Sequence, residues 1–140
     1  MAKHKYISCD IYKRGIHIFI GKPDEFKEWI INYFDEKESE AFVKSTVSWI
    51  ESGNIGEASF HYDNGIGSGV ILIPYSPRTP SGYAILEHEL LHATFFILNL
   101  CGVDYDYNGN NEAFTYLLEH LTKNALEPKG YEEIKKNSKK

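Results

Sequence analysis

Hydrophobic and polar positions follow two different periods along the chain, and the change between them marks the predicted elements. Residues 5–21 (KYISCDIYKRGIHIFIG) are rich in β-branched and aromatic side chains around a turn at 13–15, which is typical of two short strands. Residues 57–63 (EASFHYD) alternate apolar and polar side chains, and after the glycines at 65–69 the segment 69–75 (GVILIPY) is apolar again. This second pattern predicts a β-hairpin.

Three other stretches carry apolar side chains three and four positions apart, which is the period of an α-helix. The first, residues 22–53, is broken by the charged segment 35–40, so that two helices or one bent helix both fit. The second, from about residue 81 to 100, is apolar on most faces and is expected in the centre of the domain. The third begins near Asn111 and runs to Pro128.

The order of these elements predicts the fold class. Strands, two helices, a hairpin, a central helix and a last helix indicate an α+β domain with a small, mostly antiparallel sheet and the helices grouped together. With 140 residues the chain has the length of one domain. We predict a single domain over residues 1–128, followed by a flexible, lysine-rich tail over residues 129–140.

Charge and composition narrow the classes of function. The formal net charge of −5 is opposite to the basic surface that a nucleic-acid-binding protein needs. The N-terminal residues MAKHKYISCD lack the apolar segment of a secretory signal, and the longest apolar stretch, 83–100, contains two histidines and two glutamates. We therefore expect no nucleic-acid or membrane partner, and a cytoplasmic location or one inside an assembly built in the cytoplasm.

Residues 87–93, EHELLHA, place two histidines four positions apart on the predicted central helix. An α-helix advances about 100° per residue, so His88 and His92 lie nearly above one another and can offer two imidazole nitrogens to one ion. Glu89 is rotated off this pair, which suits a carboxylate that takes a proton from metal-bound water. Because roughly 0.025 matches to this pattern are expected by chance at this composition, the string indicates a zinc site.

A third ligand is expected downstream, because a catalytic zinc usually has three protein ligands and an open position for water. The candidates are Asp104, Asp106, Glu112, Glu119 and His120. Glu112 is the best placed of them, since it follows His92 by 20 residues and lies on the first turn of the next helix, beyond a loop that lets the two helices fold back on each other. We predict zinc ligation by His88, His92 and Glu112, and the other candidates stay open.

The motif HELLH, followed 20 residues later by NNEAFTY, resembles the gluzincin branch of the zincin metallopeptidases. The resemblance covers residues 81–120 and implies a minimal zincin-like domain with an HExxH helix and a following ligand helix. It also implies that an edge strand ahead of the HExxH helix, here residues 57–63 or 69–75, holds an extended substrate by strand addition. A looser similarity is to short HExxH proteins encoded by bacteriophages.

The chain departs from the gluzincin pattern at two points. Four residues after the ligand glutamate, where the family often has an aspartate, this chain has Tyr116. We also expect no C-terminal subdomain of the kind that, in many members, supplies the histidine or tyrosine that stabilises the tetrahedral oxyanion. Tyr116 and His120 share the helix face of Glu112, so we expect them to act as the donors to the oxyanion.

Two functional hypotheses follow from these residues. The first is a zinc-dependent metallopeptidase in which Glu89 activates a zinc-bound water for attack on a peptide bond of a peptide or protein substrate. The alternative is a catalytically inactive zincin-like metal-binding protein that acts as a structural or binding component of a larger assembly, for instance a phage particle. The absence of a GxSxG motif speaks against a serine nucleophile.

Overall fold

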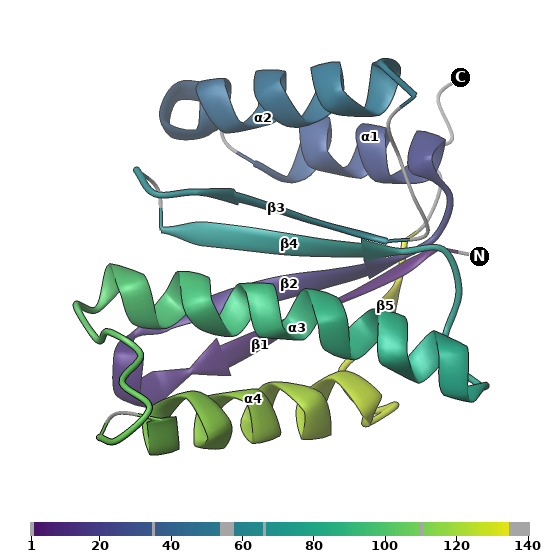
Figure 1. The fold of residues 1–140 in the computed structure, drawn as a ribbon. Coiled ribbons are helices and arrows are strands. Elements are labelled where there is room, and N and C mark those ends of the chain that lie inside the picture. The colour runs from purple at the N-terminus through teal and green to yellow at the C-terminus, as the bar shows by residue number, and fades with distance from the viewer. Residues whose placement is uncertain (1, 35, 54–57, 66, 110, 135–140) are drawn as a thin grey trace, which may run out of the picture.

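The computed structural model describes residues 2–34, 36–53, 58–65, 67–109 and 111–134, which form one sheet with helices on both faces (Figure 1). The strands are β1 (Lys3–Cys9), β2 (Arg14–Ile20), β3 (Ser59–Asp63), β4 (Ser68–Ile73) and β5 (Glu132–Glu133). The helices are α1 (Pro23–Tyr33), α2 (Glu36–Glu51), α3 (Pro80–Leu100) and α4 (Asn111–Leu126), with a short 3-10 helix at Asp10–Tyr12. The predicted α+β class is confirmed, and the stretch 22–53 forms two helices.

The sheet has the strand order β3-β4-β2-β1-β5. Its neighbours pair antiparallel except β2 and β4, which run parallel with Ile18 opposite Ile71. The predicted hairpin 57–75 is therefore present as β3 and β4, and the mostly antiparallel sheet is confirmed. Because β4 lies between β3 and β2, β3 forms one edge of the sheet.

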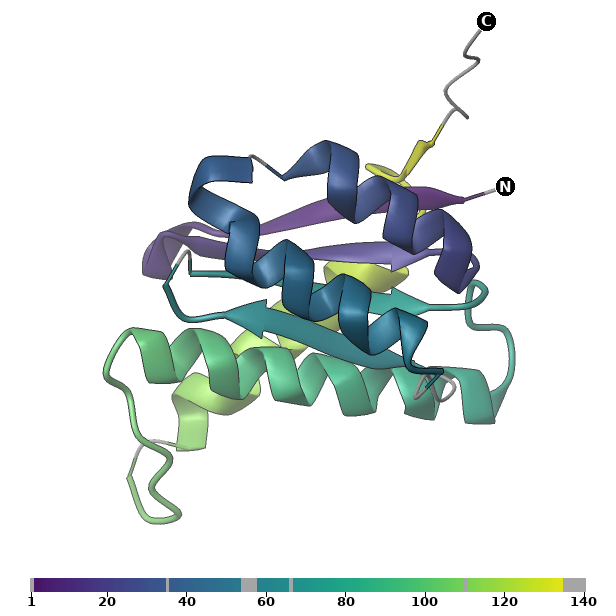
Figure 2. The ribbon, with the colours of Figure 1, turned by 90° about the horizontal axis from the view of Figure 1, so that it is seen from above.

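The helices cover opposite faces of the sheet in two pairs, so the prediction that they group together is wrong (Figures 1 and 2). The reason lies in the two central strands, where six of the seven residues of β2 and five of the six residues of β4 are buried. Strands that are buried on both faces need cover on both. The α1–α2 pair packs on the face of Phe19, Val70 and Leu72, and the α3–α4 pair packs on the face of Ile18 and Ile71.

The helix α3 is buried on one side only, which differs from the expectation of burial on most faces. Its sheet-facing side chains are spaced three and four residues apart: Leu86, Leu90, Ala93 and Ile97. On its outer side Leu91 and Phe95 remain 42% and 44% exposed. No helix within the described ranges combines the length and apolar character that spanning a membrane requires.

The beginning of the predicted tail belongs to the fold. Strand β5 pairs with Lys3 and His4 of β1, and the backbone N–H of Ile134 donates to the carbonyl oxygen of Ala2 at 2.8 Å. Residues 132–134, within the segment predicted as a tail, therefore pair with the start of the chain in spite of their polar composition. Residues 135–140 lie outside the described residues.

Lys5 fastens α4 to the sheet. Its side chain is buried, and Nζ donates hydrogen bonds to the carbonyl oxygens of Asn124, at 2.5 Å, and Glu127, at 2.9 Å. These carbonyls lie at the C-terminal end of α4, where the helix leaves acceptors without intrahelical partners and where a positive charge is favourable. Burial lowers the pKa of Lys5 below its usual value, and the nearby Glu127 carboxylate offsets only part of this shift.

We expect Lys5→Met to lower the free energy of unfolding by about 2 kcal/mol, because two hydrogen bonds from a buried charged group are lost. Urea denaturation followed by circular dichroism measures this change. Lys44→Met is the matched control, since the Lys44 side chain is 81% exposed, and its effect should stay below about 0.5 kcal/mol. Equal effects of the two substitutions would contradict the role assigned to Lys5.

Candidate functional site

The two ends of α3 hold the helix that carries the HELLH motif. At its start the Thr79 side chain accepts a hydrogen bond from the backbone N–H of Gly82 at 3.1 Å, and Pro80 occupies the first helical position. At its end Gly102 adopts a φ of +76° and the N–H of Val103 donates to the Leu98 carbonyl oxygen at 2.9 Å. The motif therefore lies in the interior of a well-capped helix, where the backbone holds its side chains at fixed angles.

His88 and His92 lie side by side on the outer side of α3. Their Nε2 atoms are 3.2 Å apart and their ring centroids 4.8 Å apart. Two nitrogens bound to one tetrahedral zinc at about 2.05 Å would be separated by about 3.3 Å. The two nitrogens therefore have the spacing that a shared ion requires. Both side chains are exposed to solvent, that of His88 to 65%.

Glu89 points away from this exposed surface and is buried. Its Oε2 atom is 4.0 Å from Nε2 of His88. Burial raises the pKa of the Glu89 carboxyl above its usual value, and the neighbouring imidazoles of His88 and His92 oppose the shift. A carboxylate with a raised pKa accepts a proton more readily, which is the property of a general base.

Beside Glu89 lies an open hollow of about 360 Å³ between α3 and the residue that precedes β3. It is lined by Ala58, Ala84, Ile85, His88 and Glu89. Further along the helix, the ring of Phe96 contacts Phe60 at 5.7 Å and Tyr62 at 5.1 Å. The strand β3 therefore runs along α3 in the same direction, starting near Glu89.

Of the two segments considered as the substrate-holding strand, the structure places residues 59–63 at the sheet edge and β4 inside the sheet. No described strand pairs with the outer side of β3, so its backbone groups there can bind an extended chain. The hollow is a feature that sequence analysis missed. In the sequence, the small side chain of Ala84, four residues before His88, is consistent with open space beside this part of α3.

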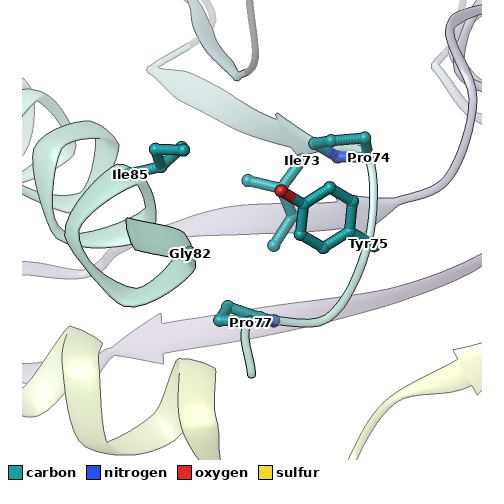
Figure 3. A pocket seen from close by; sticks show the side chains of 6 residues that line it. All are labelled: Ile73, Pro74, Tyr75, Pro77, Gly82 and Ile85. Atoms are coloured by element: carbon teal, nitrogen blue, oxygen red, sulfur yellow. The ribbon is translucent and has the colours of Figure 1, made fainter. Parts of the chain in front are cut away.

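A second, smaller pocket, drawn in Figure 3, shares the lining residue Ile85 with the hollow. It lies between the end of β4 and the first turn of α3, and it is lined by Ile73, Pro74, Tyr75, Pro77, Gly82 and Ile85. Its volume of about 10 Å³ corresponds to one water molecule. Apolar walls therefore continue from the hollow towards the start of α3.

The structure does not bring Glu112 to the histidine pair. Within the described residues, no three His, Cys, Asp or Glu side chains lie close enough to hold a metal ion together. The helices α3 and α4 pack in an antiparallel register set by two contacts: Glu87 Oε1 accepts a hydrogen bond from Thr122 Oγ1 at 2.5 Å, and the Phe95 and Phe114 rings are 5.0 Å apart.

This register places Glu112 level with Ile97, five residues beyond His92, or about 7.5 Å further along the α3 axis. Glu119, another of the open candidates, is instead level with Leu90, between the two histidines. The loop length predicts that α3 and α4 fold back on each other, but the distance of His92 from the end of α3 decides which residue of α4 lies beside it. Because the helices are antiparallel, a ligand beside the histidine pair must lie as far from the start of α4 as the pair lies from the end of α3. Glu112, in contrast, lies on the first turn of α4.

The two expected oxyanion donors also lie apart from the pair. Nε2 of His120 donates to the carbonyl oxygen of Ser8 in β1 at 2.9 Å, so His120 faces the sheet edge opposite β3. Tyr116 is 67% exposed on α4. Over the described part of the chain, no hydrogen bond or ring contact joins either residue to His88 or His92.

The remaining ligand candidates, Asp104 and Asp106, lie in the exposed loop between α3 and α4. There Asp106 Oδ1 accepts a hydrogen bond from the backbone N–H of Asn108 at 3.0 Å. Asp106 therefore caps a turn in its own loop. The site as a whole consists of an exposed histidine pair, a buried carboxyl and a hollow beside a free sheet edge.

Comparison with known proteins adds no name to this arrangement. No protein-family model matches the chain, and neither the curated proteins nor the solved structures contain a significant match to it. The interpretation of the site therefore depends on its own geometry.

Proposed function

We propose that the protein is a zinc-dependent hydrolase of peptide bonds, with His88 and His92 as metal ligands and Glu89 as the general base. The observation that carries this proposal is the 3.2 Å separation of the two Nε2 atoms beside a buried carboxyl whose pKa is raised by burial. Imidazole nitrogens are ordinary ligands of Zn²⁺, so the donors fit this ion in kind and in spacing.

The donor set is incomplete in number, because two histidines provide two of the usual three protein ligands. We propose that a carboxylate of α4 supplies the third. Glu112 is favoured by its spacing in the sequence and Glu119 by its height beside the pair. In either case the carboxylate has to move towards α3, since neither lies in a metal-holding group in the structure.

A bound zinc ion supplies a Lewis acid that lowers the pKa of a water molecule and polarises the substrate carbonyl. Glu89 takes one proton from the attacking water, and the oxygen of this water bonds to the carbonyl carbon of the substrate. When the C–N bond breaks, Glu89 delivers this proton to the departing amine. The free edge of β3 binds the substrate in an extended form beside the hollow next to Glu89.

A second candidate function is a zincin-like metal-binding protein without catalysis, which acts as a component of a larger assembly such as a phage particle. It is supported by the exposed position of the histidine pair and by the distance of Tyr116 and His120 from it. Without a donor to the oxyanion, the attack on a peptide bond loses a large part of its stabilisation.

Metal analysis of protein purified without chelators tests the shared part of both proposals. We expect about one zinc per chain. We also expect His88→Ala or His92→Ala to weaken zinc binding more than about 100-fold. Loss of a residue that only hydrogen-bonds to a ligand already weakens metal affinity by about 10–100-fold, and loss of the ligand itself should cost more. Competition with a chromogenic chelator measures the affinity. His120→Ala is the control and should leave it unchanged; absence of zinc from the wild type overturns both functions.

The same competition assay identifies the third ligand. Glu112→Gln and Glu119→Gln each remove one carboxylate of α4 while keeping its size. The variant that removes the ligand should weaken zinc binding more than about 10-fold, and the other serves as its control. If neither changes the affinity, α4 does not complete the site.

Cleavage of a peptide library by wild type and Glu89→Gln separates the enzyme from the non-catalytic protein. We expect the substitution to reduce cleavage about 100-fold or more, because the general base is lost, and to leave zinc content unchanged. Mass spectrometry of the products measures both the rate and the cleaved bond. A wild type that binds zinc and cleaves no peptide favours the non-catalytic function.

A further inference from the structure

Three of the histidines lie on the other face of the sheet, the one that the α1–α2 pair covers; Figure 2 shows this helix pair from above. His4 of β1 and His17 of β2 have ring centroids 5.9 Å apart, and both contact Trp29 of α1, at 5.0 and 5.7 Å. His61 of β3 contacts Trp49 of α2 at 4.8 Å. The histidines therefore lie at the interface between the sheet and these two helices.

His17 is 5% exposed, and its Nδ1 atom is buried without a hydrogen-bond partner among the described residues. Aromatic rings surround it, since Tyr33 and Phe34 lie 5.1 and 5.6 Å from its ring. Burial, together with the nearby His4, lowers the pKa of His17 to about 4. A proton on this ring would have to enter an environment that offers it no acceptor.

His61 lies on the same face of the sheet but on the edge strand β3, where it is half-buried and lines an open hollow of about 260 Å³ between α2 and β3. Its Nε2 atom is 2.9 Å from Oγ of Ser59, and its ring packs between Trp49 and Phe26. Burial lowers the pKa of His61 to about 4. Burial also lowers the pKa of His4, and Glu132 opposes that shift.

No described carboxylate pairs with a histidine at this interface, apart from the charge of Glu132 near His4. The other titratable groups that face His4 and His17 are the phenols of Tyr6 on β1 and Tyr33 on α1. The side chains described against His61 are Phe26, Trp49 and Ser59, which are uncharged at these pH values. Protonation of His17 or His61 is therefore not offset by an opposite charge.

The opposite face lacks such groups. Among the described residues His17 is the only buried histidine, and none is buried between the sheet and α3–α4. The α1–α2 pair is held to the sheet mainly by apolar packing, and the ion pair between Lys27 and Glu51, at 2.6 Å, joins α1 to α2. The Phe34 ring at the end of α1 also contacts Phe42 of α2 at 5.2 Å, and this packing favours movement of the two helices as one unit.

We propose that acid releases the α1–α2 pair from the sheet as a unit, through protonation of His17, His61 and His4, while α3 and α4 remain packed on the other face. The charged imidazole of His17, which is buried, is solvated only when the helices above it move away, and charges on the half-buried His4 and His61 weaken the same interface. Release exposes the apolar side chains that α1 and α2 cover, among them Phe19, Val70 and Leu72. The device is independent of the metal centre, because its three histidines lie on the opposite face of the sheet from α3.

The pH range follows from the direction of the shifts. In the released form His17 and His61 titrate near 6.5, whereas in the packed form their pKa is about 4. Stability of the packed form is therefore fully present above pH 6.5 and is lost as the pH falls towards 4. The two protons taken up by His17 and His61 together raise the equilibrium constant for release by up to about 100-fold per pH unit in this range.

Hydrogen–deuterium exchange of the full chain at pH 7.5, 5.5 and 4.5, corrected for the intrinsic exchange rates, tests the proposal. We expect peptides from α1 and α2 to lose protection at least about 10-fold more than peptides from α3 and α4 between pH 7.5 and 4.5. Fluorescence of an apolar dye should increase over the same range. Equal loss of protection in all four helices would show global acid unfolding and overturn the proposal.

Histidine substitutions test the cause of the release. His17→Phe keeps a ring of similar shape among its aromatic neighbours, and we expect it to shift the midpoint of α1–α2 release to lower pH by at least about 0.5 unit. The His17→Phe/His61→Phe double variant should shift it further. His120→Gln is the control, since His120 lies on α4, and should leave the midpoint unchanged. If His17→Phe folds and its midpoint equals that of the wild type, the proposal fails; if it does not fold, the exchange pattern of the wild type alone decides.

Discussion

The structure depends on the parallel pairing of β2 and β4, two strands that are buried on both faces. Such a strand pair is stable in water only when helices cover both sides, so the chain has to place one helix pair above and one below it. This requirement separates two chemically different interfaces. The face beneath α1–α2 contains the buried His17 among aromatic rings, and the face beneath α3–α4 is mostly aliphatic, with no histidine among its described buried residues.

The candidate metal centre is a consequence of how α3 packs. The side chains of Leu86, Leu90 and Ala93 face the sheet and set the rotation of the helix about its axis. With this rotation fixed, His88 and His92 point outwards, and Glu89 turns towards the edge strand β3. Burial of the Glu89 carboxyl costs stability, and the same burial makes it a stronger base, which is common at functional sites.

The two helix pairs also differ in how metal binding or a change of pH would affect their packing. The α3–α4 pair is held by aromatic and hydrogen-bond contacts that fix its register, so a metal ion would have to draw a carboxylate of α4 towards the histidines. The α1–α2 pair covers imidazoles that are neutral at pH 7 because burial lowers their pKa. According to the two proposals, metal binding would therefore act on the α3–α4 pair, and protonation would act on the α1–α2 pair.

Local spacing in the sequence by itself determined the elements, the hairpin and the approach of His88 to His92, because helix and strand periods follow from backbone geometry alone. Only the tertiary structure decided which strand forms the edge, which helices cover which face, and that residues 132–133 join the sheet as β5. It also decided that Glu112 lies level with Ile97 and that His17 is buried. These features depend on the packing of segments far apart in the chain, and such contacts leave no periodic pattern in the sequence.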